Sequence, residues 1–161
     1  MARHLQSHLN GAWVTGRGAP VPLADAATGQ IVATLDATGL DMAGALDFGR
    51  RVGGPELRAM TFHQRALMLK ALGTRLMEMK EDFHAESLHT GATRADGRID
   101  IEGGIGTLLS YASKARRELP NAHVLPEGPA EPLSRDHSFS AQHILTPLTG
   151  VAVHVLSLIH I

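Results

Sequence analysis

The sequence predicts a mixed α/β fold, and three patterns lead to this prediction. Short apolar runs alternate with turn residues over residues 9–35, apolar residues recur at every third or fourth position over residues 61–118, and a β-branched run follows Gly150. These patterns are typical of a small antiparallel strand layer, amphipathic helices and a buried strand of a parallel sheet. With 161 residues, 43% of them hydrophobic, the chain is apolar enough for one ordinary core.

Two turn signals mark the expected amino-terminal strands. Asn10-Gly11 precedes the apolar run 12–14, and Thr28-Gly29 precedes the run 31–35. Asn-Gly is a strong hairpin signal because both residues tolerate a positive φ. We therefore expect short antiparallel strands in this region.

The first two helices are predicted from caps and breakers. The first should open at Thr38, which is followed three residues later by Asp41, and should end at the breaker sequence 53–55. The second should open at Thr61, which forms a capping box with Gln64, and should continue to Thr90-Gly91. Its apolar stripe consists of Phe62, Ala66, Leu69, Leu72, Leu76, Met79 and Phe83.

A third helix and a proline-rich connection are expected next. Asp96 or Asp100 caps the helix, which ends before Pro120. Five prolines between residues 120 and 147 predict an irregular or edge-strand connection that wraps over the surface. The apolar stripe of the third helix consists of Ile101, Ile105, Leu108, Leu109 and Ala112.

The β-branched run 151–155 predicts a strand that is buried on both faces of a parallel sheet. A parallel neighbour needs a crossover of roughly a dozen or more residues, whereas only six residues follow Val155. We therefore expect this chain to be the front part of a larger enzyme.

Composition excludes several classes of chemistry and partner. The chain has no cysteine, so this sequence supplies no disulfide, no thiolate zinc site and no cysteine nucleophile. A net charge of −1 favours neither nucleic acid nor an anionic membrane as a partner. Residues 1–9 contain no apolar signal run, and no stretch approaches the roughly 20 apolar residues of a membrane span, so we expect a cytoplasmic protein.

The candidate chemical motifs all favour structural interpretations. Gly103-Gly104-Ile105-Gly106 lies inside a helical pattern, so we expect these glycines to let two helices approach closely. His4 with His8, and His84 with His89, lack a third ligand nearby, so no metal is predicted. Acidic pairs and single serines complete the set, with no acid–base or nucleophilic role predicted: Asp100, Glu102, Glu81, Asp82, Ser110, Ser113 and Ser140. The sequence thus predicts no catalytic, cofactor-binding or metal-binding residue.

Several stretches resemble the aldehyde dehydrogenase superfamily. Leu9-Asn10-Gly11-Ala12-Trp13-Val14 and residues 26–33 are similar to its amino-terminal strands, and residues 57–66 with the helix ending at Thr90-Gly91 follow its first long helices. Within the superfamily, the chain looks like the bifunctional proteins of aerobic phenylacetate degradation. The matching stretches are residues 39–43, 91–96, 100–107, 117–120 and 150–154. The related semialdehyde dehydrogenases of benzoate degradation are similar but match residues 93–98 less well.

The resemblance implies the front of a Rossmann-type cofactor domain over residues 1–155. Full members of the branch oxidise a CoA-linked semialdehyde with NADP, carry a ring-opening hydratase half and form homo-oligomers. In that chemistry a thiolate attacks the aldehyde, hydride leaves to the nicotinamide, a Glu activates water and an Asn holds the oxyanion. The Cys and Glu would lie beyond this sequence, so the chain alone is expected to be inactive.

The last six residues, 156–161, depart from the family pattern. Where the family has an Asn-Phe-Pro segment, Ile159 stands at the position of the oxyanion Asn, and an aliphatic group cannot donate a hydrogen bond. We therefore expect residues 156–161 to be non-native. The alternative function is a freestanding helical binding or regulatory module that pairs with intact dehydrogenase subunits.

Overall fold

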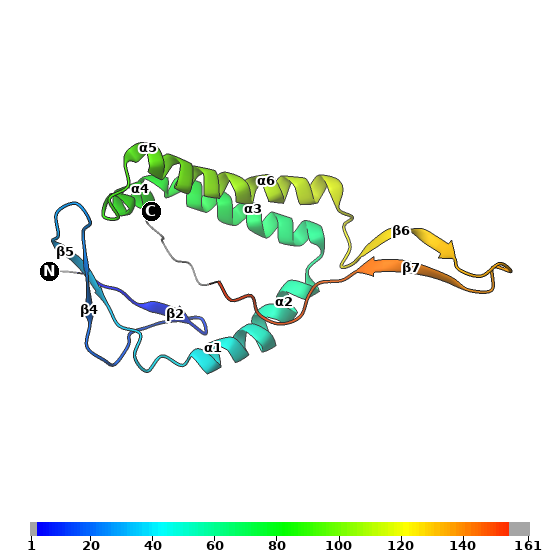
Figure 1. Cartoon of the computed structure of the whole chain (residues 1–161), viewed down its shortest axis with the longest axis horizontal. Coiled ribbons are helices and arrows are strands. Elements are labelled where there is room, and N and C mark those ends of the chain that lie inside the picture. The colour runs from blue at the N-terminus through cyan, green and yellow to red at the C-terminus, as the bar shows by residue number, and fades with distance from the viewer. Residues whose placement is uncertain (1–2, 155–161) are drawn as a thin grey trace.

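The structure is a computed structural model that describes residues 3–154. It has three small sheets and a set of helices of which the longest two, α3 and α6, lie side by side (Figure 1). Val155 and the expected non-native tail, residues 156–161, lie outside the described residues. Among the helices of the described part, none combines the length and apolar character that crossing a membrane requires.

The antiparallel strands predicted at the amino terminus are confirmed. Asn10 and Gly11 adopt φ of 54° and 81° in the turn of the first hairpin, as a tight two-residue turn requires. The first strand pairs in parallel with the fifth, which was not predicted. The strands are β1 (Arg3–His4), β2 (Ser7–Leu9), β3 (Ala12–Val14), β4 (Val21–Ala24) and β5 (Ile31–Leu35), with antiparallel pairs β2–β3 and β4–β5.

The first predicted helix is longer than expected. The predicted start at Thr38 is wrong, because Asp41 caps α1 (Met42–Phe48) by accepting a hydrogen bond from the amide of Gly44 at 2.8 Å. The breaker sequence 53–55 does not end it, because a π-helical turn (Gly49–Gly53) leads directly into α2 (Gly54–Ala59). The predicted stop is wrong because Pro55 lies in the first turn of α2, where its missing N–H is tolerated.

The second predicted helix is divided in two. Thr61 caps α3 (Phe62–Glu78) through the predicted box, since its amide donates to Gln64 Oε1 at 2.8 Å and its hydroxyl accepts from the Gln64 amide at 3.2 Å. The helical path breaks at Met79, and α4 (Lys80–Leu88) follows. Glu81 and Asp82 fall in the first turn of α4, where negative charge favours a new helix start.

The third predicted helix has a different cap. Thr93, and neither Asp96 nor Asp100, caps α5 (Arg94–Gly97), and Asp96 is the reciprocal partner in its capping box. A π-helical turn (Arg98–Glu102) joins α5 to α6 (Gly103–Glu118). The end before Pro120 is confirmed.

The proline-rich connection forms a projecting hairpin. Strands β6 (Leu125–Pro132) and β7 (Ser140–Leu145) pair antiparallel and extend away from the helices (Figure 1). The prediction that this segment wraps over the surface is wrong. Prolines are compatible with a two-stranded ribbon because each strand has an unpaired edge.

The described part of the predicted strand at 150–155 is not in a sheet. Residues 151–154 have no strand assignment, since no neighbouring strand in the described range 3–154 pairs with them. A run with strand propensity needs a partner to satisfy its backbone groups.

Little apolar surface is buried. Among the described residues, the fully buried apolar side chains are Ala33, Ala66, Ile105 and Ala112. The accessible surface is 12131 Å², whereas a folded monomer of 17.1 kDa exposes about 7,800 Å². The elements therefore form an open arrangement with its apolar faces largely uncovered.

The contact between α3 and α6 involves a glycine outside the predicted run. A Cβ at Gly103, Gly104 or Gly106 would meet no atom within 4 Å, so the prediction that these residues bring helices together is wrong. A Cβ at Gly73 of α3 would lie 2.9 Å from Leu109 Cδ2 of α6. Gly73 therefore sets the spacing of α3 and α6.

Replacing Gly73 by leucine is expected to separate α3 from α6. Overpacking of this kind costs about 1–3 kcal/mol, which corresponds to a loss of hydrogen-exchange protection of roughly 5- to 150-fold in both helices. Gly104→Leu is the matched control, because open space surrounds Gly104 in α6. Equal protection in the two variants, measured by exchange and mass spectrometry, would show that the glycine contact does not hold the pair.

Candidate functional site

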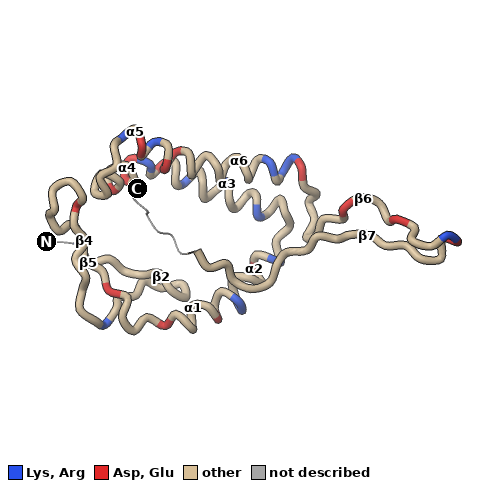
Figure 2. The backbone as a smooth tube through the Cα atoms, viewed as in Figure 1, with Lys and Arg blue, Asp and Glu red and all other residues tan. Residues whose placement is uncertain are grey.

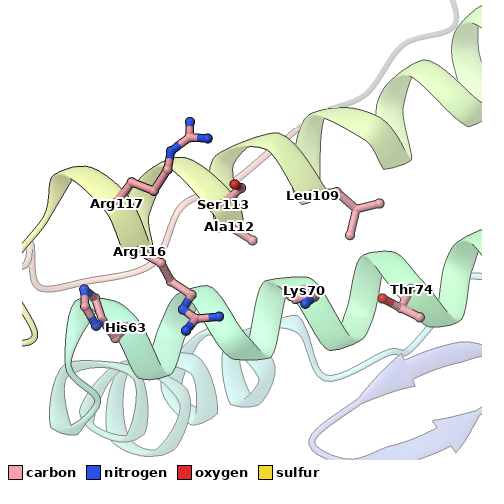
Figure 3. A pocket seen from close by; sticks show the side chains of 8 residues that line it. All are labelled: His63, Lys70, Thr74, Leu109, Ala112, Ser113, Arg116 and Arg117. Atoms are coloured by element: carbon pink, nitrogen blue, oxygen red, sulfur yellow. The ribbon is translucent and has the colours of Figure 1, made fainter.

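A groove runs between α3 and α6 and has a volume of about 600 Å³ (Figure 3). We call it the α3–α6 groove. Residues at helical spacing on each helix lie on the face that lines it. From α3 these are His63, Lys70 and Thr74, and from α6 they are Leu109, Ala112, Ser113, Arg116 and Arg117.

The charge of the α3–α6 groove is one-sided. The basic residues of the lining are Lys70, Arg116 and Arg117, of which Arg117 is directed away from α3 (Figure 3), and the described lining contains no carboxylate. Figure 2 places basic residues together near the carboxyl end of α6. In Figure 3, Arg116 is directed toward α3, whereas Arg117 points to the opposite side of α6. The groove is therefore suited to an anionic group.

A second polar cluster joins α4 to the start of α6. Glu102 Oε2 accepts from Lys80 Nζ at 3.3 Å, and Glu102 Oε1 lies 3.4 Å from Nε2 of His84, which is 2% exposed. The hydrogen bond from Lys80, followed by that from His84, lowers the pKa of Glu102. Because His84 packs against the backbone at Gly97, this cluster fixes α4 against α5 and the π-helical turn.

The small sheet is attached to the end of α4 by Asp25 and His89. Asp25 Oδ2 lies 2.8 Å from His89 Nδ1, and the amide of Ala26 donates to the His89 carbonyl at 2.9 Å. The hydrogen bond from His89 and that from the Thr28 amide lower the pKa of Asp25 to about 2. Arg3 also forms a two-pronged ion pair with Glu86, at 3.0 and 3.1 Å.

The attachment through Asp25 is expected to weaken in acid. A carboxyl whose pKa falls on folding stabilises the fold above its unfolded pKa, and this contribution is lost as pH falls through the folded pKa. For Asp25 the window lies between pH 3.8 and about 2. Asp25→Asn should therefore speed hydrogen exchange at the Thr28 amide at neutral pH, with a difference from the parent chain that fades across this window. A difference that persists at the acid end would contradict this assignment.

The sequence-level histidine pairs do not come together. His4 Nδ1 lies 2.8 Å from Thr34 Oγ1, and His8 stacks edge-on against Trp13 with 4.9 Å between ring centroids. His84 and His89 contact different carboxylates, Glu102 and Asp25. Within the part of the chain that the structure describes, no group of three or more His, Asp or Glu side chains could hold a metal ion.

The remaining candidates are also dispersed. Glu81 pairs with Arg94 at 2.6 Å, and this hydrogen bond lowers the pKa of Glu81. Ser113 lines the α3–α6 groove, Ser110 is exposed on α6 and Ser140 begins β7. The three serines therefore do not share a site.

Sequence reasoning missed the α3–α6 groove. Its lining comes from two helices whose nearest contributions, Thr74 and Leu109, are 35 positions apart in the sequence. The signal was present in the basic and hydroxyl residues that share one face of each helix, but the pairing of the two faces could not be read from either pattern alone.

Comparison of the sequence with known proteins identifies the family of this chain. The chain belongs to the aldehyde dehydrogenase family, whose model matches residues 13–153. It is similar to the 3,4-dehydroadipyl-CoA semialdehyde dehydrogenase of Aromatoleum evansii, with 37% identity over 152 residues. That match covers 94% of this chain and 29% of the relative, so the chain spans less than a third of the relative's length.

Proposed function

We propose that residues 1–155 are the amino-terminal portion of an aldehyde dehydrogenase that oxidises a CoA-linked semialdehyde with NADP. The observation that supports this most strongly is the 37% identity, over nearly the whole chain, to a dehydrogenase whose name specifies a CoA semialdehyde. The open apolar faces support it as well, because an amino-terminal portion leaves surfaces for the rest of a domain to cover.

The described residues do not themselves fit a dinucleotide. The glycine run at residues 103–106 forms the first turn of α6 and follows a π-helical turn. The dinucleotide fingerprint instead needs glycines directly after a strand. We therefore assign NADP, which would accept hydride in the whole protein, to residues outside this chain.

For the pathway, we propose aerobic phenylacetate degradation, with a ring-opening hydratase half in the full protein. Support comes from the sequence blocks at residues 91–96 and 100–107, which resemble that branch. The Aromatoleum relative is named for a different CoA semialdehyde. Preference for the ring-opened CoA semialdehyde of phenylacetate degradation over the relative's CoA semialdehyde would support the pathway proposal. Oxidation of either compound would support the broader proposal of a CoA-semialdehyde dehydrogenase.

A chimera tests the broader proposal. Residues 13–153 would replace the corresponding segment of the Aromatoleum enzyme, and oxidation of its CoA semialdehyde would be compared with oxidation of the same aldehyde without CoA. We expect the chimera to be active and to prefer the CoA-linked form. A chimera that folds but has lost activity on both forms, while the parent enzyme oxidises the CoA semialdehyde, would contradict the proposal.

We further propose that the whole protein is a homo-oligomer and that the β6–β7 hairpin contacts a second subunit. An isolated two-stranded ribbon is marginal in water, and this one carries large exposed apolar side chains away from the helices. These are Leu133, Phe139, Ile144 and Leu145.

Phe139→Glu in the chimera is expected to shift oligomers toward monomers, because it places a charge on a surface that association would bury. Analytical ultracentrifugation measures the shift. His137→Glu, at the hairpin turn, serves as the control because it adds the same charge at a polar position. Unchanged sedimentation of the Phe139→Glu chimera would remove the hairpin from the interface.

The excess exposed surface also supports the second candidate, a helical module that binds intact dehydrogenase subunits. Co-purification of this chain with a full-length homologue would favour the module. Failure to bind intact subunits, together with an active chimera, would favour the amino-terminal portion.

A further inference from the structure

We propose that the α3–α6 groove binds the diphosphate group of a small molecule. Its volume of about 600 Å³ lies within the range of small-molecule sites. The proposal is independent of aldehyde oxidation, because it concerns only residues of α3 and α6.

The groove supplies the donors that a diphosphate needs. Arg116 can hold two phosphate oxygens in its planar fork, and Lys70 provides a point charge from the facing helix. Thr74 and Ser113 add one hydroxyl from each wall. Neither Lys70 nor Arg116 forms an ion pair within the described range, so an incoming anion meets no competing carboxylate on them.

The walls of the groove are held in place before any ligand arrives. His63 Nε2 donates to the Leu119 carbonyl at 2.8 Å and so ties the first turn of α3 to the end of α6. Farther along, the close approach of Leu109 to Gly73 sets the helix spacing. These contacts fix the spacing of the two helices that carry the donors, so the two walls need not be brought together when an anion binds.

A small molecule fits this geometry better than an acidic polypeptide. The link between His63 and Leu119 joins the two helices at one end of the groove, and an extended peptide that ran through this end would have to cross it. Leu109 and Ala112 add an apolar surface beside the cations, against which the organic part of a diphosphate ester can pack. Nucleotides and CoA both carry such a group.

Arginine modification with phenylglyoxal tests the proposal on the chimera that carries residues 13–153, in which the rest of a dehydrogenase supports α3 and α6. Inorganic pyrophosphate at saturation should slow modification of Arg116 by about tenfold or more, as mapped by mass spectrometry. Arg50 and Arg135 are exposed outside the groove and serve as internal controls in the same sample, with unchanged rates. Equal rates with and without pyrophosphate, or equal protection of all three arginines, would overturn the proposal.

A variant and alternative ligands identify the donor and the source of the diphosphate. Lys70→Gln should weaken pyrophosphate protection by about tenfold, whereas Lys114→Gln, which removes an exposed lysine paired with Glu118, should leave it unchanged. Stronger protection by ADP than by CoA would identify a nucleotide, and the reverse would identify CoA. Protection by polyglutamate but not by pyrophosphate would replace the small molecule with an acidic protein segment and overturn the proposal.

Discussion

The 161-residue chain, purified alone, is expected to oxidise no CoA-linked semialdehyde when NADP is supplied. The chemistry that its family resemblance implies begins with attack by a thiolate, and this sequence contains no cysteine. The expected effect is complete loss of turnover. Absorbance of the reduced nicotinamide measures it directly.

The chimera with the remainder of the Aromatoleum dehydrogenase is the positive control for this assay, because it restores residues that this chain does not contain. Turnover by the chain above the enzyme-free blank, retained after removal of trace contaminants, would show that another group performs the covalent step. That result would contradict the proposal that the covalent step needs residues that this chain does not contain.

The second large effect is expected in thermal unfolding. The chain exposes about half again the surface of a folded monomer of its mass, and large apolar side chains such as Trp13 and Met42 are more than 60% exposed. We therefore expect broad loss of helical circular dichroism on heating, without a sharp transition, together with binding of a hydrophobic dye.

A sharp two-state transition of the monomer, with little dye binding, would contradict that expectation. The Gly73→Leu chain provides a further comparison. If α3 and α6 form the best-ordered part of the isolated chain, this variant should lose helical signal at a lower temperature than the Gly104→Leu chain.

Features governed by local chemistry could be predicted from the sequence. Asn10-Gly11 specifies a hairpin turn because both residues accept positive φ, and Thr61 with Gln64 specifies a helix start through two reciprocal hydrogen bonds. These signals operate within a few residues, so they do not depend on what the rest of the molecule does.

Features that depend on contacts between distant parts of the chain could not be predicted from the sequence. Met79 divides an apolar stripe whose spacing continues through it, so the periodicity alone could not show the break. The cap at Thr93 is a different case, because its capping box with Asp96 is local and its spacing is present in the sequence. The glycine that matters for packing, Gly73, has no distinguishing local pattern. The α3–α6 groove could not be predicted either, because its donors come together only after the two helices pair.

Co-expression of this chain with the remaining segment of the Aromatoleum dehydrogenase tests the central claim most directly, because the claim is that the rest of a dehydrogenase covers the open faces. The measurement is thermal unfolding of the affinity-purified material. We predict that the two segments co-purify in equal amounts and unfold in one cooperative transition. Recovery of the remaining segment alone, folded and without this chain, would contradict the claim.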